Sequence, residues 1–183
     1  MTAILDLVNF GSAESGYKRV CSRCFNPKPA EESGQADFED AKFPPIRIAD
    51  SLRKFHKFHF RTNFFGPGVA LNAFEFRKGR PAGYEFQVIG EPEDDLKGLY
   101  AELVAKIRRA LSIQHVVQGE MGSQIADHRV VRGRIGWDPA QNGRVPALVI
   151  DGREIYWEEF GRMLMTYEGW QFKLSIFDRS EEV

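Results

Sequence analysis

The stretch FHKFHFRTNFF, residues 55–65, decides the fold class of this chain. Its aromatic and β-branched content predicts a β-strand, because such side chains fit the pleated, half-buried surface of a sheet. The turn Gly66-Pro67-Gly68 follows, and Val69–Phe76 is a second strand candidate. Beyond a polar turn, apolar and polar residues alternate from Tyr84 to Val88 and predict a third strand. We therefore expect an antiparallel meander.

Two segments carry apolar residues at the spacing of an amphipathic helix, the first over residues 96–111 and the second over residues 157–167. Acidic residues at 93–95 precede the first helix, and basic residues between 106 and 109 lie near its end, as the helix dipole favours. Gly169 is well placed to end the second helix. The apolar positions are Leu96, Leu99, Tyr100, Leu103, Val104, Ile107 and Leu111 in the first helix, and Trp157, Phe160, Leu164 and Tyr167 in the second.

The C-terminal third contains further strand candidates. Residues 130–137 predict one strand, and residues 147–150 and 153–156 flank Asp151-Gly152, a two-residue link typical of a hairpin. In a last predicted strand apolar and polar residues alternate, so one face should be buried. The whole pattern predicts an α+β fold, in which a mainly antiparallel sheet of about six or seven strands carries two helices on one face. The apolar residues of the last strand are Trp170, Phe172, Leu174 and Ile176.

Composition places the chain among globular proteins. Its 183 residues, 43% of them hydrophobic and 28% charged, are enough to bury a core without disulfide support. The net charge of -1 gives no global positive field that would draw the protein onto nucleic acid or an anionic membrane. Residues 1–16 make a poor secretory signal, and no apolar run approaches a membrane span. We therefore expect a cytoplasmic protein without membrane contact.

A change of composition divides the chain near Pro44-Pro45. Residues 27–45 contain prolines, Ser33-Gly34 and an acidic run, and these features interrupt regular structure. Residues 1–45 are therefore predicted to form a small N-terminal knuckle module and linker, and residues 46–183 the main α+β domain. Within the first part, prolines at 27 and 29 predict that no helix follows the cysteines.

Cys21 and Cys24 are the most specific chemical signal in the chain. In a Cys-x-x-Cys turn two thiolates can bind one tetrahedral zinc ion, and a reducing compartment favours metal or redox chemistry over a disulfide. A complete zinc site needs two more ligands, and His56 and His59 are the first candidates. Residues three apart in a regular strand point to opposite faces, so both histidines could bind one ion only if a bulge or a turn intervenes.

Other interpretations of the same residues stay open. The cysteines could use other ligands, namely His115, His128 or Asp37, or could be two thiols without a metal. A thioredoxin-like role is weaker, because that chemistry needs the first cysteine at a helix N-terminus. The linear signatures of nucleotide-binding loops, zinc proteases, α/β-hydrolases and deaminases are absent from the sequence. A catalytic triad that includes His59 would leave no linear trace.

Two sets of residues could contact nucleic acid. Basic residues on neighbouring strand candidates could contact phosphates, and phenylalanines of residues 55–65 could stack on bases. A solvated sheet face and a buried core are the commoner outcomes for such residues. The basic set is Arg77, Lys78, Arg80, Arg129, Arg132, Arg134, Arg144 and Arg153. The aromatic set is Phe55, Phe58, Phe60, Phe64 and Phe65.

Several longer stretches are distinctive when taken together. They are VCSRCFN at 20–26, FHFR at 58–61 with FGPGVAL at 65–71, and VIDGREI at 149–155 with WEEFGRML at 157–164 and EGWQF at 168–172. With these stretches the chain resembles a family of uncharacterised bacterial proteins that is known only as a domain of unknown function. The resemblance spans most of the chain and implies a bacterial cytoplasmic origin. It implies no activity, substrate or catalytic residue.

From these features we expect a binding or adaptor protein with an unknown protein partner and a structural zinc ion at the cysteines. A small metal-dependent or hydrolytic enzyme is the alternative from another class, and a nucleic-acid-binding regulator is the third. The adaptor should hold buried metal or none, and should lack a cleft lined by clustered histidines and carboxylates. An enzyme should have an open coordination position or a pocket with shifted acid and base groups. A regulator should bind nucleic acid in a salt-sensitive manner.

Overall fold

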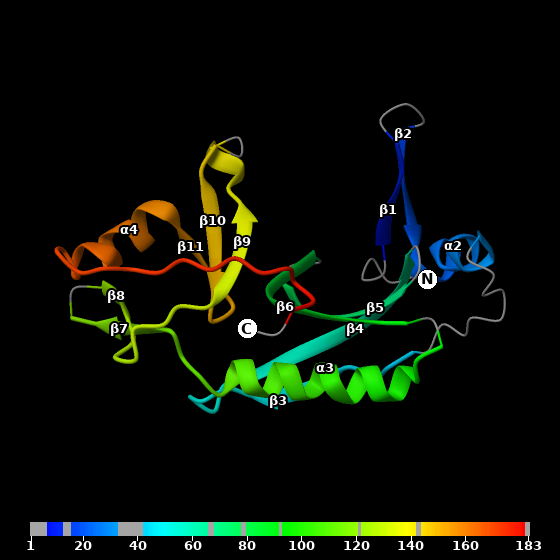
Figure 1. Ribbon diagram of the computed structural model, residues 1–183, viewed down its shortest axis with the longest axis horizontal. Helices are drawn as coiled ribbons and strands as arrows, with labels where there is room; N and C mark the ends of the chain where they lie inside the picture. Colours follow the sequence, from blue (N-terminus) through cyan, green and yellow to red (C-terminus); the bar gives the residue numbers. More distant parts are fainter. Residues whose placement is uncertain are drawn as a thin grey trace.

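A computed structural model describes residues 7–12, 16–32, 42–65, 68–77, 80–91, 93–120, 122–141 and 144–181. These residues form an α+β fold in which the strands pair antiparallel (Figure 1), so the predicted fold class is confirmed. The strands are β1 (Leu7–Ser12), β2 (Gly16–Cys21), β3 (Ile46–Ala49), β4 (Phe55–Phe65), β5 (Gly68–Arg77), β6 (Arg80–Gly90), β7 (Val116–Gly119), β8 (Gly122–Ile125), β9 (Gly133–Trp137), β10 (Pro146–Ile150) and β11 (Arg153–Tyr156). The helices are α1 (Ser22–Phe25), α2 (Pro27–Glu32), α3 (Leu96–Leu111), the 3-10 turn η2 (Pro139–Gln141) and α4 (Trp157–Met165).

The first layered unit is the four-stranded sheet β3–β4–β5–β6 with α3 on one face. The predicted meander is confirmed, because β4 pairs with β5 and β5 pairs with β6, both antiparallel. Side chains alternate along β4, so Phe58 points toward the helix and packs with Leu71, Val88 and the helix residue Leu103. This sheet face and α3 together enclose the core of the first unit.

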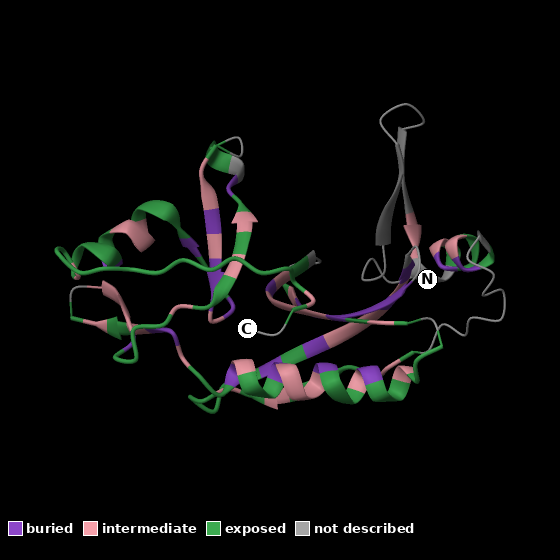
Figure 2. Cartoon of the chain, viewed as in Figure 1, coloured by how far each residue is buried: buried purple, intermediate pink, exposed green. Residues whose placement is uncertain are grey.

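The helix α3 follows its predicted amphipathic pattern. Its buried residues recur at helical spacing and appear as purple bands along α3 in Figure 2, and they pack against the sheet. The carboxylate of Asp95 caps the first turn, accepting hydrogen bonds from the backbone N–H of Lys97 at 3.0 Å and of Gly98 at 3.2 Å. The buried residues are Leu99, Leu103, Ile107 and Leu111.

The second layered unit follows α3 in the chain. It contains the three-stranded sheet β11–β10–β9, the two-stranded sheet β7–β8 and the helix α4. The predicted hairpin is confirmed, and its link has left-handed φ angles of 50° at Asp151 and 67° at Gly152. The core of this unit contains Ile150 and Ile155 from the hairpin, and Met163 from α4.

The strands belong to separate sheets, which differs from the single sheet expected from the sequence. The helices α3 and α4 accordingly pack on different sheets. A period-two pattern identifies strands and the faces that they bury, but it does not determine which strands become neighbours. The short strands β7 and β8 also lie where no regular structure was predicted.

The predicted final strand over residues 170–176 is wrong. The segment follows α4 as an extended stretch without secondary structure, and it runs toward the first unit (Figure 1). Its apolar side chains are exposed instead of buried, and Phe172 reaches 89% exposure. Alternation shows that one face of a strand is suited to burial, but nothing in the pattern requires the covering surface to come from the same chain.

The absence of a helix after the cysteines, predicted from the two prolines, is also wrong. The short helices α1 and α2 follow β2, and α2 begins at Pro27. Proline is tolerated in the first turn of a helix, because its missing N–H would have no partner within the helix there. The division of the chain at residue 45 stays a prediction.

The C-terminal residues are hydrogen-bonded to the first unit. The Nζ atom of Lys106 on α3 donates to the backbone oxygens of Ser180 at 3.0 Å and Glu181 at 2.8 Å. The carboxylate of Glu85 on β6 pairs with Arg134 of β9 at 3.2 Å and with Arg179 at 3.4 Å.

Within the described ranges, no helix is long and apolar enough to cross a membrane.

Candidate functional site

The two cysteines meet at the junction of a strand and a short helix. Cys21 ends β2 and Cys24 lies in α1. Their Sγ atoms are 3.2 Å apart and are not joined in a disulfide; Cys24 is exposed and Cys21 is partly buried. A zinc ion lies about 2.3 Å from each sulfur that binds it. The structure therefore brings the two predicted sulfur ligands close enough to share one ion.

Asn26 fixes this turn to the main sheet. Its buried side chain donates a hydrogen bond to the backbone oxygen of Thr62 at 3.0 Å and accepts one from the backbone N–H of Phe64 at 2.9 Å. The Asn26 amide thus forms hydrogen bonds with two backbone groups at the end of β4 that could otherwise pair with a neighbouring strand. Sequence reasoning gave Asn26 no role, because an amide after two cysteines is not a specific signal.

His56 is buried between two carboxylates in the first unit. Only 2% of the residue is exposed. Its Nδ1 atom lies 2.9 Å from Oε1 of Glu75, and its Nε2 atom lies 3.0 Å from Oδ2 of Asp50. Each ring nitrogen thus lies within hydrogen-bond distance of a carboxylate oxygen. His56 is therefore engaged on both sides within its own sheet.

His59 lies on the opposite face of β4, as strand geometry predicted. Its ring packs near the rings of Phe74 and Phe76. Burial and the nearby charge of Lys57 hold the pKa of His59 below its usual value. The two histidines are thus not brought together by a bulge or a turn.

The predicted four-ligand zinc site is not assembled. In the part of the chain that the structure describes, no group of three or more His, Cys, Asp or Glu side chains could hold a metal ion. The cysteine turn is anchored at Thr62, and at about 3.3 Å per residue this lies about 10 Å along β4 from His59 and about 20 Å from His56. Binding of zinc by these four residues stays a prediction.

The alternative ligands lie elsewhere. His115 and His128 belong to the second unit, where their rings contact each other at a centroid distance of 5.3 Å. A ring nitrogen of His115 lies 2.8 Å from the backbone oxygen of Val130, and one of His128 lies 2.9 Å from that of Gln114. Asp37 lies outside the described residues.

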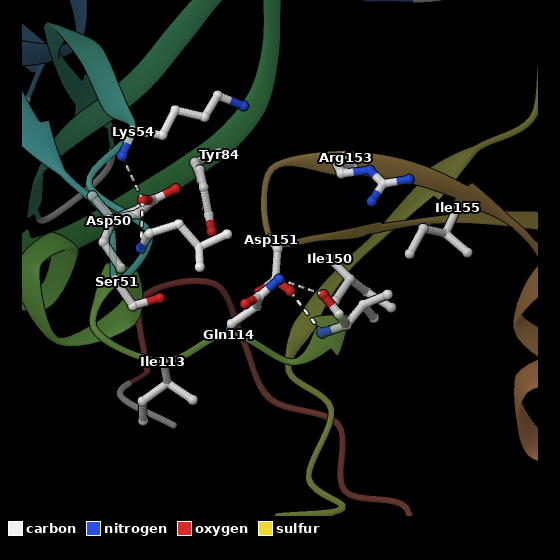
Figure 3. A pocket seen from close by; sticks show the side chains of 13 residues that line it. Asp50, Ser51, Lys54, Tyr84, Ile113, Gln114, Ile150, Asp151, Arg153 and Ile155 are labelled. Atoms are coloured by element: carbon white, nitrogen blue, oxygen red, sulfur yellow. Dashed lines mark hydrogen bonds between the residues drawn. The ribbon is translucent and has the colours of Figure 1, made fainter. Parts of the chain in front are cut away.

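A cavity of about 130 Å³ lies between the two units (Figure 3). The turn between β3 and β4 contributes Asp50, β6 contributes Tyr84, and the β10–β11 hairpin contributes Asp151. The hydroxyl of Tyr84 points into the space between the two aspartates, whereas the charged ends of Lys54 and Arg153 point away from it (Figure 3). No linear signal could have revealed this cavity, because its residues come from distant parts of the chain.

The groups around the cavity have shifted acid–base properties. Burial raises the pKa of Asp50, but hydrogen bonds from His56 and from the backbone N–H groups of Lys54 and Leu52 outweigh burial and hold that pKa below its usual value. Burial, together with the charges of Asp151, Asp50 and Glu75, raises the pKa of Tyr84 far above its usual value. At neutral pH the cavity therefore presents a carboxylate beside a neutral phenol.

The carboxylates of the cavity also have structural partners. Oδ2 of Asp151 accepts hydrogen bonds from the backbone N–H groups of His115 at 2.9 Å and Val116 at 2.8 Å. Oδ1 of Asp50 accepts from the backbone N–H groups of Leu52 and Lys54, both at 2.9 Å. These contacts hold the hairpin and the β3–β4 turn in place, each within its own unit.

A second feature is a large exposed apolar area in the C-terminal part of the chain. Of the sixteen large apolar residues that are exposed in the described ranges, eleven lie between residues 135 and 177. They include all three tryptophans of the sequence. We call these eleven the apolar surface: Ile135, Trp137, Tyr156, Trp157, Leu164, Met165, Trp170, Phe172, Leu174, Ile176 and Phe177.

Several residues considered for nucleic-acid contact are buried in the core or contact other side chains. Phe58 and Phe64 are fully buried in the core. Phe55 is exposed, and the guanidinium group of Arg47 lies 4.8 Å from the centre of its ring. Arg77 pairs with Glu75 at 3.2 Å, and Arg134 pairs with Glu85. These positions agree with the commoner interpretation, in which such residues lie in a buried core or on a solvated sheet face.

Two family models match the chain one after the other. Residues 39–112 match a domain of unknown function, DUF7686, and residues 113–181 match another domain of unknown function, DUF7713. The boundary between them follows the last residue of α3, Leu111, so each model covers one layered unit. No curated protein and no solved structure matches the chain. Residues 39–181 are therefore similar to two domains of unknown function that follow each other along the chain, which is consistent with the resemblance to an uncharacterised family.

Proposed function

We propose that the chain is a binding or adaptor protein that contacts a protein partner through its apolar surface. The observation that carries this proposal is the gathering of eleven exposed large apolar residues between residues 135 and 177. Scattered single apolar residues are normal on a protein surface, but such a concentration of exposed large apolar side chains in one part of the chain favours a site where another molecule binds. Tryptophan and tyrosine dominate the energetic centres of protein interfaces, and this surface contains both.

Pull-down experiments with a matched pair of variants test this proposal. Met165 on the apolar surface and Leu52 in the β3–β4 turn are almost equally exposed, at 65% and 66%. We expect tagged full-length protein to capture a stoichiometric partner, Leu52→Asp to capture it equally, and Met165→Asp to lose it. Because both positions are exposed, neither substitution should disturb the core. Capture that is unaffected by Met165→Asp, or no stoichiometric capture at all, would contradict the proposal.

We propose in addition that Cys21 and Cys24 supply half of a structural zinc site. The separation of 3.2 Å between their Sγ atoms supports this, since one ion can bridge two sulfurs held so close. The other ligands would be His56 and His59, as the sequence predicted, or Asp37, which lies outside the described residues. The two histidines would have to leave their present contacts to reach the cysteines. A reducing cytoplasmic location accords with two cysteines that are not joined in a disulfide.

Elemental analysis of the purified full-length chain tests the zinc proposal. We expect one zinc per chain, lost in Cys21→Ser and retained in the control His128→Ala. The variants His56→Ala and His59→Ala then show whether either ring is a ligand. A zinc content that Cys21→Ser leaves unchanged removes the proposal.

A small hydrolytic or metal-dependent enzyme is the second candidate, and the cavity is the observation that favours it. Asp50 and Tyr84 have shifted pKa values there, and such shifts cluster at active sites as well as in structural networks. The volume of about 130 Å³ is small beside the roughly 300–1,000 Å³ of ordinary ligand pockets. Both ring nitrogens of His56 face carboxylates, so this ring is poorly placed to take a proton from a substrate. Turnover of small esters that Tyr84→Phe abolishes would favour the enzyme.

A nucleic-acid-binding regulator is the third candidate. The pairing of Arg77 with Glu75 and of Arg134 with Glu85 reduces the positive charge available to phosphates. We expect no gel shift with single- or double-stranded nucleic acid at physiological salt. A shift that weakens steeply with added salt would favour the regulator over the adaptor.

A further inference from the structure

The C-terminal segment, residues 170–177, is extended and held by its own chain near both ends. The guanidinium group of Arg129 lies 5.2 Å from the centre of the Trp170 ring. Just beyond the other end, Nζ of Lys106 donates to the backbone oxygens of Ser180 and Glu181. Between these contacts the apolar side chains are exposed, at every second residue from Trp170 to Ile176. The segment therefore has the shape of a strand and lacks a sheet.

The strand β9 is an edge that lacks a covering layer. Among the described strands it pairs with β10 alone. A row of side chains crosses the sheet from Ile155 through Leu148 to Ile135, because these residues are opposite each other in register. Ile155 is fully buried, Leu148 is partly buried, and Ile135 is 60% exposed. The apolar face that α4 covers at β11 thus continues uncovered to the edge of the sheet.

We propose that a second copy of this chain covers both features, so that residues 170–176 of one copy pair as a strand with β9 of the other. The inference rests on the proposed function, because it assigns a partner to one part of the apolar surface. An edge strand offers unpaired backbone groups to any extended segment. The period-two apolar rows of the two elements would then lie on one face of a four-stranded sheet.

The exposed apolar area limits how much surface the proposed contact can bury. Six residues face the proposed contact, four from the C-terminal segment together with Ile135 and Trp137 of β9. With at most about 150–250 Å² for each side chain, the six expose on the order of 800 Å² per copy, which is an upper limit on what the contact can bury and is similar to the contribution of one partner to an interface of standard size. Ordering the segment as a strand costs conformational entropy, which the apolar contacts and the new backbone hydrogen bonds have to exceed.

Analytical ultracentrifugation of the full-length chain tests the proposal. We expect a dimer, twice the chain mass of 20.9 kDa, for the native sequence and for the control Leu52→Asp. Phe172→Asp on the segment and Ile135→Asp on β9 should each weaken the dimer more than about tenfold, because each places a charge in an apolar contact. Circular dichroism should show that both variants remain folded, since both side chains are exposed in one copy. A monomeric native chain, or a dimer unaffected by both substitutions, overturns the proposal.

Crosslinking identifies which elements meet. One copy carrying Phe172→Cys and a differently tagged copy carrying Ile135→Cys, both with Cys21→Ser and Cys24→Ser, are mixed and oxidised. We expect a crosslinked species that contains both tags. Crosslinks confined to copies that each carry Phe172→Cys would show that segment pairs with segment, and a crosslinked monomer of a chain with both substitutions would show that the segment folds onto its own sheet. Either result overturns the proposal.

The outcomes separate this inference from the adaptor proposal. A monomer that still captures a partner sensitive to Met165→Asp contradicts the dimer and keeps the adaptor. A dimer lost in Phe172→Asp, with no other protein captured, keeps the dimer and contradicts the adaptor.

Discussion

Replacing His56 with alanine should lower the free energy of unfolding by about 3–5 kcal/mol. The ring is 2% exposed and Glu75 is 7% exposed, so both partners of the 2.9 Å contact are buried. Removal of the ring leaves the Glu75 carboxylate in the core with Arg77 as its remaining charged partner, and it also removes the contact to Asp50. Breaking one side of a buried pair has a large effect, because the Glu75 carboxylate stays buried while it loses the partner of its Oε1 atom.

The control for this prediction is His59→Ala on the opposite face of β4. The His59 ring is partly buried and contacts only aromatic rings among its described partners, so its loss should lower the free energy of unfolding by about 1 kcal/mol. Urea unfolding at neutral pH, followed by circular dichroism, gives both free energies. An unchanged slope of the unfolding free energy against urea concentration would show that the variants expose the same amount of surface on unfolding. If His56→Ala is no more destabilising than His59→Ala, the reasoning about the buried pair is wrong.

Three further predictions follow from the described contacts. Asn26→Ala should lower the free energy of unfolding by about 1–3 kcal/mol, because it removes two buried hydrogen bonds to β4; an unchanged urea midpoint would contradict this role. The pKa of Asp50 is held below its usual 3.8, so its stabilising effect should be complete above that value and be lost as the pH falls through the lower pKa of the folded state; a stability difference between the native protein and Asp50→Asn that grows on acidification would contradict this. Gly152→Ala should destabilise the protein by at least about 1–2 kcal/mol, because φ is 67° and a Cβ atom would lie 2.6 Å from Cδ2 of Tyr84. By contrast, a Cβ atom at Gly161 in α4 would meet nothing within 4 Å, so Gly161→Ala should stabilise the protein by up to about 1 kcal/mol. Equal changes in the thermal unfolding temperature for the two variants would refute this comparison.

The elements that the sequence predicted correctly are those set by local chemistry. The first helix was identified from apolar spacing and flanking charges, and its buried residues from Leu99 to Leu111 are the predicted ones. The hairpin was identified from Asp151-Gly152, because glycine tolerates the positive φ that a two-residue link requires, and both residues adopt left-handed φ angles in the structure. The opposite faces of His56 and His59 followed from strand geometry alone.

The features that escaped prediction depend on contacts between distant residues. The cavity joins Asp50, Tyr84 and Asp151 from three separate elements, and no sequence spacing connects them. The exposure of Phe172 depends on whether a covering layer exists, which alternation cannot show. Asn26 acts through the backbone of β4, and a backbone partner leaves no trace in the sequence.

Hydrogen exchange measured by mass spectrometry tests the central claim most directly, by comparing the free full-length chain with the same chain carrying its captured partner. If the apolar surface binds protein, amides of α4 and of residues 170–177 should exchange more slowly in the complex, while those of β4 and β5 should be unchanged. Unchanged exchange over residues 157–177, or protection confined to the four-stranded sheet, would contradict the claim that this surface is where the protein acts.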